Sequence, residues 1–400
     1  MKKYDILGIM TGYARLLDEA LSTHFSRYRE VLVLLGARQV GKTTIIQKLF
    51  PDALYLSVDN ESVRANLDRY DSSVYRQLLS DQAKQVIIDE LHLLHDPGRA
   101  AKIIRDQMPD IQLIITGSSS FSIKNRTSES LAGRKIDYHL YPLAYTEYLV
   151  QQGIENTLSY QTMQFLLEKN AVPEERIHAF DQVGILRNIL IYGLYPGMMQ
   201  HPQDGIYLKN LIDSAIFKDI LDLSLVESRS AALSLLRLVA YQTGSLVNMT
   251  ELATRLGLNI KTVKRYLTIF EQSFIIFPLY PYAKSGRDEI GKMPKIYFYD
   301  TGIRNALIDN FQVPETRNDM GQLFENFVVS ELYKLNTYGN YGISFHYWRT
   351  RQGSEIDLVL SRGDTLFGIE IKYQSGKISR AFQDRYPQAT CNLLTAKNFY

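Results

Sequence analysis

The stretch VLVLLGARQVGKTT, residues 31–44, joins a short apolar run to a loop that contains two glycines. Residues 36–43 fit the pattern G-x-x-x-x-G-K-[ST], and the following TTIIQKLF has the composition of a helix. A buried strand, this loop and a helix in that order form a P-loop. The backbone N–H groups of such a loop and the positive end of the helix dipole bind phosphate. The stretch therefore predicts a nucleotide site inside an α/β domain.

We expect ATP at this site, with Mg²⁺ as its cofactor. Lys42 would reach the β- and γ-phosphates, and Thr43 would place its hydroxyl on the metal. The whole loop supplies the expected nucleotide-binding residues: Gly36, Ala37, Arg38, Gln39, Val40, Gly41, Lys42, Thr43 and Thr44.

A second apolar run, residues 85–88, ends in Asp89 and Glu90. Open α/β sheets bind their ligands at the carboxyl ends of the strands. Asp89 would hold Mg²⁺, and Glu90 would act as the general base on the attacking water. The alternative is an acidic helix start that only complements the helix dipole. The P-loop in the same chain favours the catalytic interpretation.

Two further positions are candidates for the nucleotide site. The apolar run 111–117 leads into three serines, and the hydroxyl of Ser118 could sense the γ-phosphate. A serine-rich turn or helix cap is the alternative there. Arg134, in the sequence LAGR, could supply positive charge to the transition state. An arginine in an ordinary surface ion pair is its alternative.

Four apolar runs, at 31–35, 53–58, 85–89 and 111–117, alternate with helical patterns. This alternation is typical of a parallel sheet covered by helices on both faces. The chain has 400 residues, 45% of them hydrophobic and 22% charged. Such a composition indicates a globular protein of several domains.

The overall charge and the cysteine content exclude several classes of protein. A net charge of +2 means that nucleic-acid contact must come from local patches. The single cysteine, Cys391, excludes an internal disulfide framework and a multi-cysteine zinc site. No apolar run approaches the ~18 residues that span a bilayer. We therefore expect a cytoplasmic protein with no membrane partner.

Residues 246–285 differ in character from the helical stretch before them. Two helical segments, MTELATRLGL and IKTVKRYLTIFEQSF, are joined by a short turn with glycine and followed by the strand-like IIFPLYPY. This spacing predicts a helix-turn-helix with a wing. Between residues 261 and 295 basic residues exceed acidic ones: Lys261, Lys264, Arg265, Lys284, Arg287, Lys292 and Lys295 against Glu271, Asp288 and Glu289. Phosphate contact and a purely structural packing role both remain open.

The segment GSEIDLVLSRGDTLFGIEIKY, residues 353–373, predicts a β-hairpin. Symmetric pairing around residues 362–365 would give one apolar face, made of Ile356, Leu358, Leu360, Phe367, Ile369 and Ile371. The other face would set Glu355 opposite Lys372 as an ordinary ion pair. It would also set Asp357 directly opposite Glu370, which is destabilising without a cation.

A Mg²⁺ ion between Asp357 and Glu370 would make that pairing favourable, because Mg²⁺ prefers oxygen ligands. Lys372 would point the same way and could position or activate a water for phosphodiester cleavage. Glu325, on a predicted helix before the sheet, could complete the metal site. A solvated helix face is the alternative for Glu325.

The chain resembles bacterial and archaeal AAA-like P-loop ATPases that carry a helix-turn-helix and a C-terminal restriction-endonuclease-like domain of formerly unknown function. The resemblance covers nearly the whole chain and rests on motifs in the family's order: GARQVGKTT, VIIDEL, ITGSSS, SLAGR, YPLAYTEYL, YGLYPGMM, KIYFYDTGIRNAL, GQLFENFVVSEL, EIDLVL and IEIK. One departure is Leu194 and Gly197, where relatives tend to read Gly-Gly-Tyr-Pro-Glu. The arrangement of Asp357 with Glu370 and Lys372 is also one that restriction-endonuclease-like enzymes use.

The resemblance implies an α/β chain of four parts. These are a P-loop AAA-like ATPase domain at 1–150, a helical domain at 151–245, a winged-helix-like helix-turn-helix at 246–285 and a restriction-endonuclease-like domain at 286–400. We expect an ATPase that acts on DNA or RNA through its nuclease fold. The alternative is a nucleotide-dependent switch that binds a protein or a nucleic acid, with a catalytically silent nuclease fold.

Two questions about the ATPase stay open at this point. A P-loop kinase for a small molecule is a third interpretation, but Asp89 followed by Glu90 fits water activation better. A homo-oligomer would decide whether Arg134 acts in its own site or in a neighbour's.

Overall fold

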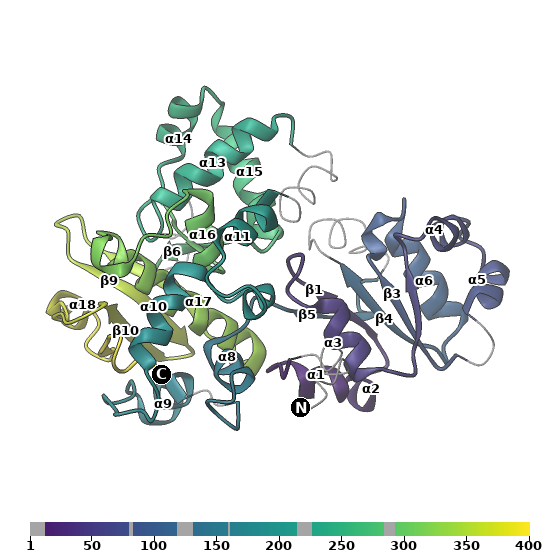
Figure 1. Ribbon diagram of the computed structural model, residues 1–400, viewed down its shortest axis with the longest axis horizontal. Helices are drawn as coiled ribbons and strands as arrows, with labels where there is room; N and C mark the ends of the chain where they lie inside the picture. Colours follow the sequence, from purple (N-terminus) through teal and green to yellow (C-terminus); the bar gives the residue numbers. More distant parts are fainter. Residues whose placement is uncertain (1–12, 80–82, 118–130, 159–160, 214–225, 284–292) are drawn as a thin grey trace, which may run out of the picture. The chain divides into compact units, whose positions relative to one another are not determined.

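The computed structural model describes residues 13–79, 83–117, 131–158, 161–213, 226–283 and 293–400 (Figure 1). The chain forms two compact units. The N-terminal unit comprises Met1–Tyr141 with Gln272–Phe274, and the C-terminal unit comprises Pro142–Glu271 with Ile275–Tyr400. Within the described ranges, no helix has both the length and the apolar character needed to cross a bilayer.

The N-terminal unit is built on a five-stranded parallel sheet with the order β2-β3-β4-β1-β5. Its strands are β1 (Val31–Leu35), β2 (Leu54–Ser57), β3 (Gln85–Asp89), β4 (Gln112–Gly117) and β5 (Lys135–His139). Every residue of β1 is buried, as a continuous apolar run requires in a sheet covered on both faces. The predicted α/β class with a parallel sheet is confirmed.

Six α-helices of the N-terminal unit are described: α1 (Asp18–Ser22), α2 (His24–Arg27), α3 (Lys42–Leu49), α4 (Glu61–Leu67), α5 (Ser72–Leu79) and α6 (Pro97–Gln107). A short 3-10 helix, η2 (Leu91–Leu93), follows β3. Local chemistry marks the helix starts. The Asn60 side chain caps α4, and Asp96 caps α6, whose first residue is a proline.

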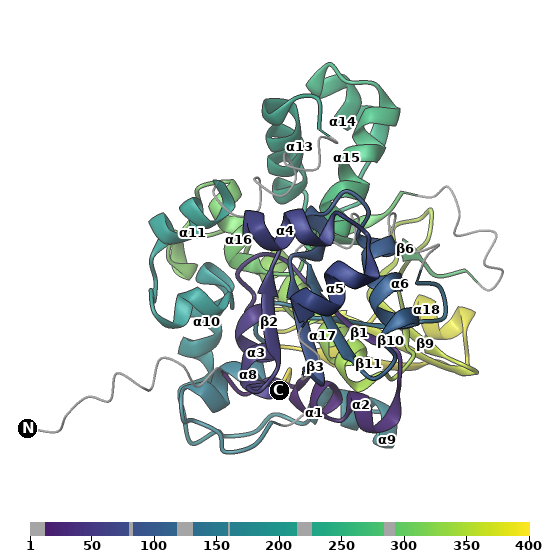
Figure 2. The ribbon, with the colours of Figure 1, turned by 90° about the vertical axis from the view of Figure 1, so that its right-hand side faces the viewer.

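The helices of the C-terminal unit are α8 (Tyr145–Gln151), α9 (Gln161–Lys169), α10 (Gln182–Tyr192), α11 (Gly205–Leu211), α13 (Arg229–Tyr241), α14 (Met249–Leu256), α15 (Ile260–Gln272), α16 (Thr301–Leu307), α17 (Met320–Gly339) and α18 (Arg380–Arg385), with 3-10 turns η3 (Pro196–Met199) and η6 (Pro314–Thr316). Helices α13, α14 and α15 gather in one lobe of this unit (Figure 1 and Figure 2). Asn248 caps α14, which ends at Gly257 in the left-handed conformation.

A six-stranded mixed sheet forms the second layer of the C-terminal unit, in the order β11-β10-β9-β8-β6-β7. Its strands are β6 (Ile276–Pro281), β7 (Lys295–Phe298), β8 (Ser344–Arg349), β9 (Glu355–Arg362), β10 (Thr365–Ile371) and β11 (Thr390–Leu394). Strand β6 pairs with β7 on one side and with β8 on the other. One sheet thus contains strands from both sides of the expected boundary at 285/286, while the four-part division stays a prediction.

The register of the β9–β10 hairpin is the symmetric one predicted from the sequence. Arg362 lies opposite Thr365, Val359 opposite Gly368 and Leu358 opposite Ile369. Both strands are buried along most of their length, and Gly368 lies against the ring of Phe382 from α18. The hairpin is therefore not a solvated surface ribbon.

A bulge in β9 changes one part of the predicted face. On β8, His346 lies opposite Val359 and Trp348 opposite Ile356, so β9 has one extra residue between these pairs. Ile356 consequently packs in one apolar cluster with Val359 and Phe382. The prediction that Ile356 shares a face with Leu358 and Leu360 was wrong, because a bulge re-aims the side chains beside it.

Candidate functional site

The expected nucleotide loop connects β1 to α3 and is shaped by two glycines. A Cβ atom on Gly36 would lie 2.2 Å from the carbonyl oxygen of Leu140, so no larger residue fits there. Gly41 has φ +96°, which L-residues rarely adopt. Arg15, which the sequence did not single out, is 4% exposed and donates to the carbonyls of Val40 (2.9 Å) and Tyr141 (2.7 Å). Arg15 thereby connects the backbone of the loop to that of Tyr141.

Lys42 lies inside the loop and is 5% exposed. Its Nζ donates to the carbonyl oxygens of Gly36 (3.0 Å) and Ala37 (2.9 Å). The remaining expected residues lie between β1 and the first turn of α3: Arg38, Gln39, Val40, Gly41, Thr43 and Thr44. The ammonium group is thus held within the loop, where the P-loop pattern expects phosphate oxygens nearby.

Thr43 and Asp89, which the sequence assigned to one metal, are in direct contact. The Thr43 hydroxyl donates to Asp89 Oδ2 at 2.8 Å. The Tyr55 hydroxyl donates to the same oxygen at 2.5 Å, and the Thr116 hydroxyl donates to Asp89 Oδ1. Strand β4 lies between β1 and β3, which explains why its end brings Thr116 beside Asp89. Tyr55 was missed, because nothing in the local sequence marks the end of β2 as part of a site.

Glu90 follows Asp89 with φ 56° and ψ 38°, an uncommon backbone conformation for a residue with a side chain. Such outliers gather at functional sites. Its Oε2 lies 3.1 Å from Nδ1 of His92, and its N–H donates to the Thr116 hydroxyl at 3.3 Å. Burial raises the pKa of Glu90 above its ordinary value, against the opposing charge of Lys42. A raised pKa suits a residue that accepts a proton near neutral pH.

Arg134 lies at the other end of the sheet from the P-loop of its own chain. Its carbonyl accepts from Val31 at the start of β1, whereas the P-loop follows Leu35 at the end of that strand. Four strand residues span ~13 Å, and the guanidinium points to Asp106 at 3.1 Å. Arg134 therefore lies away from the P-loop of its own chain, and its role as a source of positive charge stays a prediction. Ser118 lies outside the described residues.

A second group of charged side chains gathers where β9 begins and β10 ends. Lys372 Nζ lies 3.1 Å from Asp357 Oδ2 and 2.7 Å from Glu370 Oε1. Asp357 Oδ2 also accepts from the backbone N–H of Ile371 at 2.9 Å. Asp357 is 6% exposed and Glu370 is 9% exposed. The tertiary structure thus brings together the two acids and the lysine that the sequence singled out.

Lys295, on the edge strand β7, also joins this group. Its Nζ lies 2.5 Å from Glu355 Oε1, 3.3 Å from Glu325 Oε1 and 4.0 Å from Asp357 Oδ1. The sequence-based pairing of Glu355 with Lys372 was wrong, because Glu355 instead contacts Lys295 and Arg349 (3.5 Å). We call these six side chains the carboxylate cluster: Glu325, Glu355, Asp357, Glu370, Lys295 and Lys372.

Glu325 is therefore not on a solvated helix face. Burial raises the pKa of Glu325 to about 7, with Asp357 adding to the rise and Lys295 opposing it. The Tyr297 hydroxyl donates to Glu325 Oε1 at 2.6 Å. Burial likewise raises the pKa of Glu370, and the charge of Asp357 adds to that rise.

The two lysines decide what the cluster can hold. Lys295 lies between Glu325 and Asp357. Lys372 lies between Asp357 and Glu370. Among the residues that the structure describes, no three His, Cys, Asp or Glu side chains are arranged as a metal-binding group. One carboxylate oxygen, Glu370 Oε2, is nevertheless buried without a hydrogen-bond partner.

The basic patch expected around the helix-turn-helix is smaller than the sequence indicated. Lys261 and Lys264 are exposed on α15, but Arg265 is paired with Glu227 at 3.0 Å. Lys295 is only 3% exposed, so counting it in this patch was wrong. The other three basic residues, Lys284, Arg287 and Lys292, lie outside the described ranges.

Comparison with known proteins divides the chain into three matched segments. A family model described as an AAA domain matches residues 28–149. Two models described as domains of unknown function match residues 184–313 (DUF8612) and 320–395 (DUF4143). The first segment contains the whole of the P-loop together with Asp89 and Glu90.

Relatives of most of the chain occur in archaea and bacteria. The uncharacterized protein MJ1637 of Methanocaldococcus jannaschii is 24% identical over 339 residues, which is 79% of this chain and 70% of that protein. The uncharacterized protein Rv2008c of Mycobacterium tuberculosis is 26% identical over 360 residues, 88% of this chain and 73% of that protein.

Among solved structures, the Walker-type ATPase PABY2304 of Pyrococcus abyssi is similar to this chain with a TM-score of 0.47. The two share 14% sequence identity, and the match covers 72% of this chain and 94% of that one. The match of residues 28–149 to the AAA model agrees with the geometry of the P-loop and Asp89. Residues 28–149 of this chain are thus similar to AAA domains.

Proposed function

We propose that the N-terminal unit binds ATP with Mg²⁺ and hydrolyses it. The observation that carries this proposal is the contact between the Thr43 hydroxyl and Asp89, with Glu90 next in the chain. A hydroxyl and a carboxylate are hard oxygen donors of the kind that Mg²⁺ takes. Mg²⁺ bound there would neutralise phosphate charge.

The residues of this chain have separate tasks in the proposed reaction. Lys42 and the loop N–H groups hold the phosphates, and Thr43 with Asp89 orients the metal. Glu90 takes the proton of the attacking water, which its raised pKa supports. Thr116 donates to Asp89 and so keeps that carboxylate in one orientation.

Phosphate release by the full chain tests this assignment. Glu90→Gln keeps the shape of the side chain but cannot accept a proton, so we expect the hydrolysis rate to fall about 10²-fold or more. Nucleotide affinity should remain in Glu90→Gln and be lost in Lys42→Ala. Unchanged phosphate release in Glu90→Gln would contradict the proposal, and a phosphorylated acceptor in place of free phosphate would indicate a kinase.

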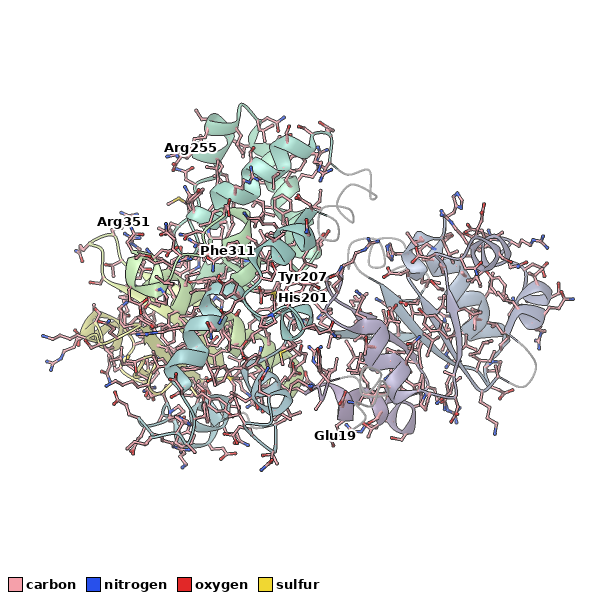
Figure 3. All side chains as sticks on the ribbon, in the orientation of Figure 1. Glu19, His201, Tyr207, Arg255, Phe311 and Arg351 are labelled. Carbon is pink, nitrogen blue, oxygen red and sulfur yellow. The ribbon has the colours of Figure 1, made fainter. Side chains whose placement is uncertain are left out.

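We further propose that the carboxylate cluster is a centre for phosphodiester cleavage in DNA or RNA. Support comes from Asp357, Glu370 and Lys372 lying together where β9 begins and its partner β10 ends. The buried and unpaired Glu370 Oε2 supports an additional ligand at this position. Arg351, labelled in Figure 3, is exposed in the turn between β8 and β9 and suits contact with a phosphate backbone.

Strand scission with Mg²⁺ or Mn²⁺ tests the second proposal. DNA and RNA should be cut by the wild-type chain, and cleavage should disappear in Asp357→Ala and in Lys372→Ala. The matched control is Asp364→Ala, in the exposed hairpin turn outside the cluster. Equal cleavage by wild type and Asp357→Ala would remove the proposal.

A second candidate function is a nucleotide-dependent switch that binds a protein or nucleic acid through a silent nuclease fold. The contact of Lys295 with three of the four acids favours it. It predicts ATP hydrolysis without any cleavage product under any metal. In this scheme a cytoplasmic homo-oligomer would let Arg134 act in a neighbour's site, which Arg134→Ala tests by a loss of ATP hydrolysis at high but not low protein concentration.

A further inference from the structure

Lys295 is the most deeply buried cation of the carboxylate cluster. It is 3% exposed, and its three acidic neighbours come from α17 and β9. Removing a lysine ammonium from water costs several kcal/mol, which only close opposite charges offset. Burial alone would lower the pKa of Lys295, yet Glu325, Glu355 and Asp357 raise it above its ordinary value. Lys295 therefore stays charged.

The backbone around Lys295 is held on both sides, so this position is built into the fold. Lys295 pairs with Leu279 of β6, and the carbonyl of Pro294 accepts from Val247 at 2.8 Å. On the same strand, Phe298 exchanges two hydrogen bonds with the Asn326 side chain, at 2.7 and 2.9 Å. Because Asn326 and Glu325 are neighbours on α17, the contact that fixes β7 also brings Glu325 to Lys295.

The acids of the cluster would attract a divalent ion, but the position of the Lys295 ammonium opposes its binding. Four carboxylates and two lysines carry two net negative charges when every acid is ionised, which one divalent cation would neutralise. The raised pKa values of Glu325 and Glu370 reduce that negative charge near neutral pH. Mg²⁺ needs its oxygen ligands at ~2.1 Å. An ammonium group already lies within 4.0 Å of Asp357, Glu325 and Glu355, and it repels a second cation.

We propose that the Lys295 ammonium occupies the cation position between Glu325, Glu355 and Asp357, and that it thereby limits metal binding by the cluster. The proposal deepens the second candidate function, in which the nuclease fold is silent, and it concerns metal affinity and not cleavage. Removing Lys295 should convert the cluster into a divalent-metal site.

Mn²⁺ binding to the full chain, measured by titration calorimetry and electron paramagnetic resonance, tests the proposal. The principal variant is Lys295→Met with Glu325→Gln, which removes one positive and one negative charge together and leaves the net charge of the cluster unchanged. We expect it to bind one additional Mn²⁺ at least about tenfold more tightly than the wild type. Adding Asp357→Asn to this variant should abolish the gain. The P-loop is the same in all variants and contributes an equal background.

Equal Mn²⁺ affinity in the wild type and the double variant would overturn the proposal, as would a gain that survives Asp357→Asn. If the double variant does not fold, the thermal unfolding of the wild type and of Asp357→Asn tests the proposal instead. Millimolar Mn²⁺ should then raise its melting temperature no more than that of Asp357→Asn, and a larger rise would overturn the proposal. Cleavage that depends on Asp357 is scored separately, so either proposal can fail without the other.

Discussion

Gly36 illustrates how single residues set the limits of the proposed nucleotide site. The carbonyl oxygen of Leu140 lies where a Cβ atom would have to be, so the loop closes against β5 only because no side chain is present. Gly321, near the start of α17, has nothing within 4 Å of its ideal Cβ position. The two glycines therefore differ in what a methyl group would do.

Gly36→Ala should lose nucleotide affinity by at least about tenfold and destabilise the N-terminal unit by about 2 kcal/mol, because the backbone has to shift. Gly321→Ala, the matched control, should stabilise the C-terminal unit by about 0.5–1 kcal/mol through helix propensity and unfolded-state entropy. Urea unfolding and a fluorescent nucleotide measure both effects. Normal nucleotide binding by Gly36→Ala would contradict the close approach of Leu140.

Asn326 shows how one helix residue covers the edge of a sheet. Strand β7 is the last strand of its sheet, and the Asn326 amide satisfies the N–H and C=O of Phe298 as another strand would. Unpaired edge groups are otherwise templates for association. Asn326 is fully buried, so water cannot replace it.

Asn326→Ala should destabilise the C-terminal unit by about 2–4 kcal/mol, because it leaves two buried backbone groups unpaired. Gln322→Ala, an exposed position on the same helix, should change the free energy of unfolding by less than about 0.5 kcal/mol. Chemical denaturation monitored by circular dichroism compares the two. Similar effects of the two substitutions would show that the Phe298 hydrogen bonds contribute little.

At the scale of elements, a buried polar network joins α10, α13, α16 and α17. The Asn305 amide donates to the carbonyls of Leu190 and Ile191 at the end of α10. Arg304 reaches the carbonyl of Ala240 on α13 and Asp319 Oδ2 before α17, at 2.8 and 2.6 Å. The network replaces the water that helix ends normally need.

Asp319 makes this network sensitive to acid. Burial alone would raise its pKa, but hydrogen bonds and charges from Arg317 and Arg304 lower it below the ordinary value of 3.8. The folded-state pKa lies below the unfolded one, so ionised Asp319 stabilises the fold above pH 3.8. That contribution is lost as the pH falls through the folded-state pKa.

Asp319→Asn should therefore cost about 3 kcal/mol at neutral pH, because it leaves two buried arginines without their carboxylate. The difference from wild type should shrink as the pH falls below 3.8. Unfolding free energies at a series of pH values measure it, with the exposed Asp309→Asn as a control. A difference that does not change with pH would contradict the ionised pair.

The whole molecule consists of two compact units, each with its own sheet and core. Separate cores usually unfold in separate transitions. The nucleotide loop lies wholly in the N-terminal unit and the carboxylate cluster wholly in the C-terminal unit. Ligands of the two sites should therefore stabilise different parts of the chain.

Calorimetry should show two transitions in the full chain. A nucleotide with Mg²⁺ at about 100 times its Kd adds about 2.7 kcal/mol to the unit that binds it. This should raise one transition by roughly 6–10 °C and leave the other unchanged, and Asp319→Asn should lower only the second. A single transition shifted by both changes would show that the two units unfold together.

The local pattern of the sequence determined several features correctly. The apolar runs predicted the parallel sheet, and the turn at residues 362–365 predicted the hairpin register. The P-loop pattern and the acids after residues 85–88 assigned Thr43 and Asp89 to one site, and the structure brings these two side chains into contact. These features depend on short-range periodicity, backbone sterics and the tendency of strand ends to meet at one edge, all of which can be read along the chain.

Only the tertiary structure decided the remaining features, because they depend on which distant elements meet. The sequence placed Lys295 in a basic surface patch, whereas the edge position of β7 brings it against acids of α17 and β9. Strand order puts Thr116 and Tyr55 on Asp89, and it puts Arg134 at the far end of the sheet. Local residues determine the elements of this protein, and the long-range pairing of those elements determines which charges face one another.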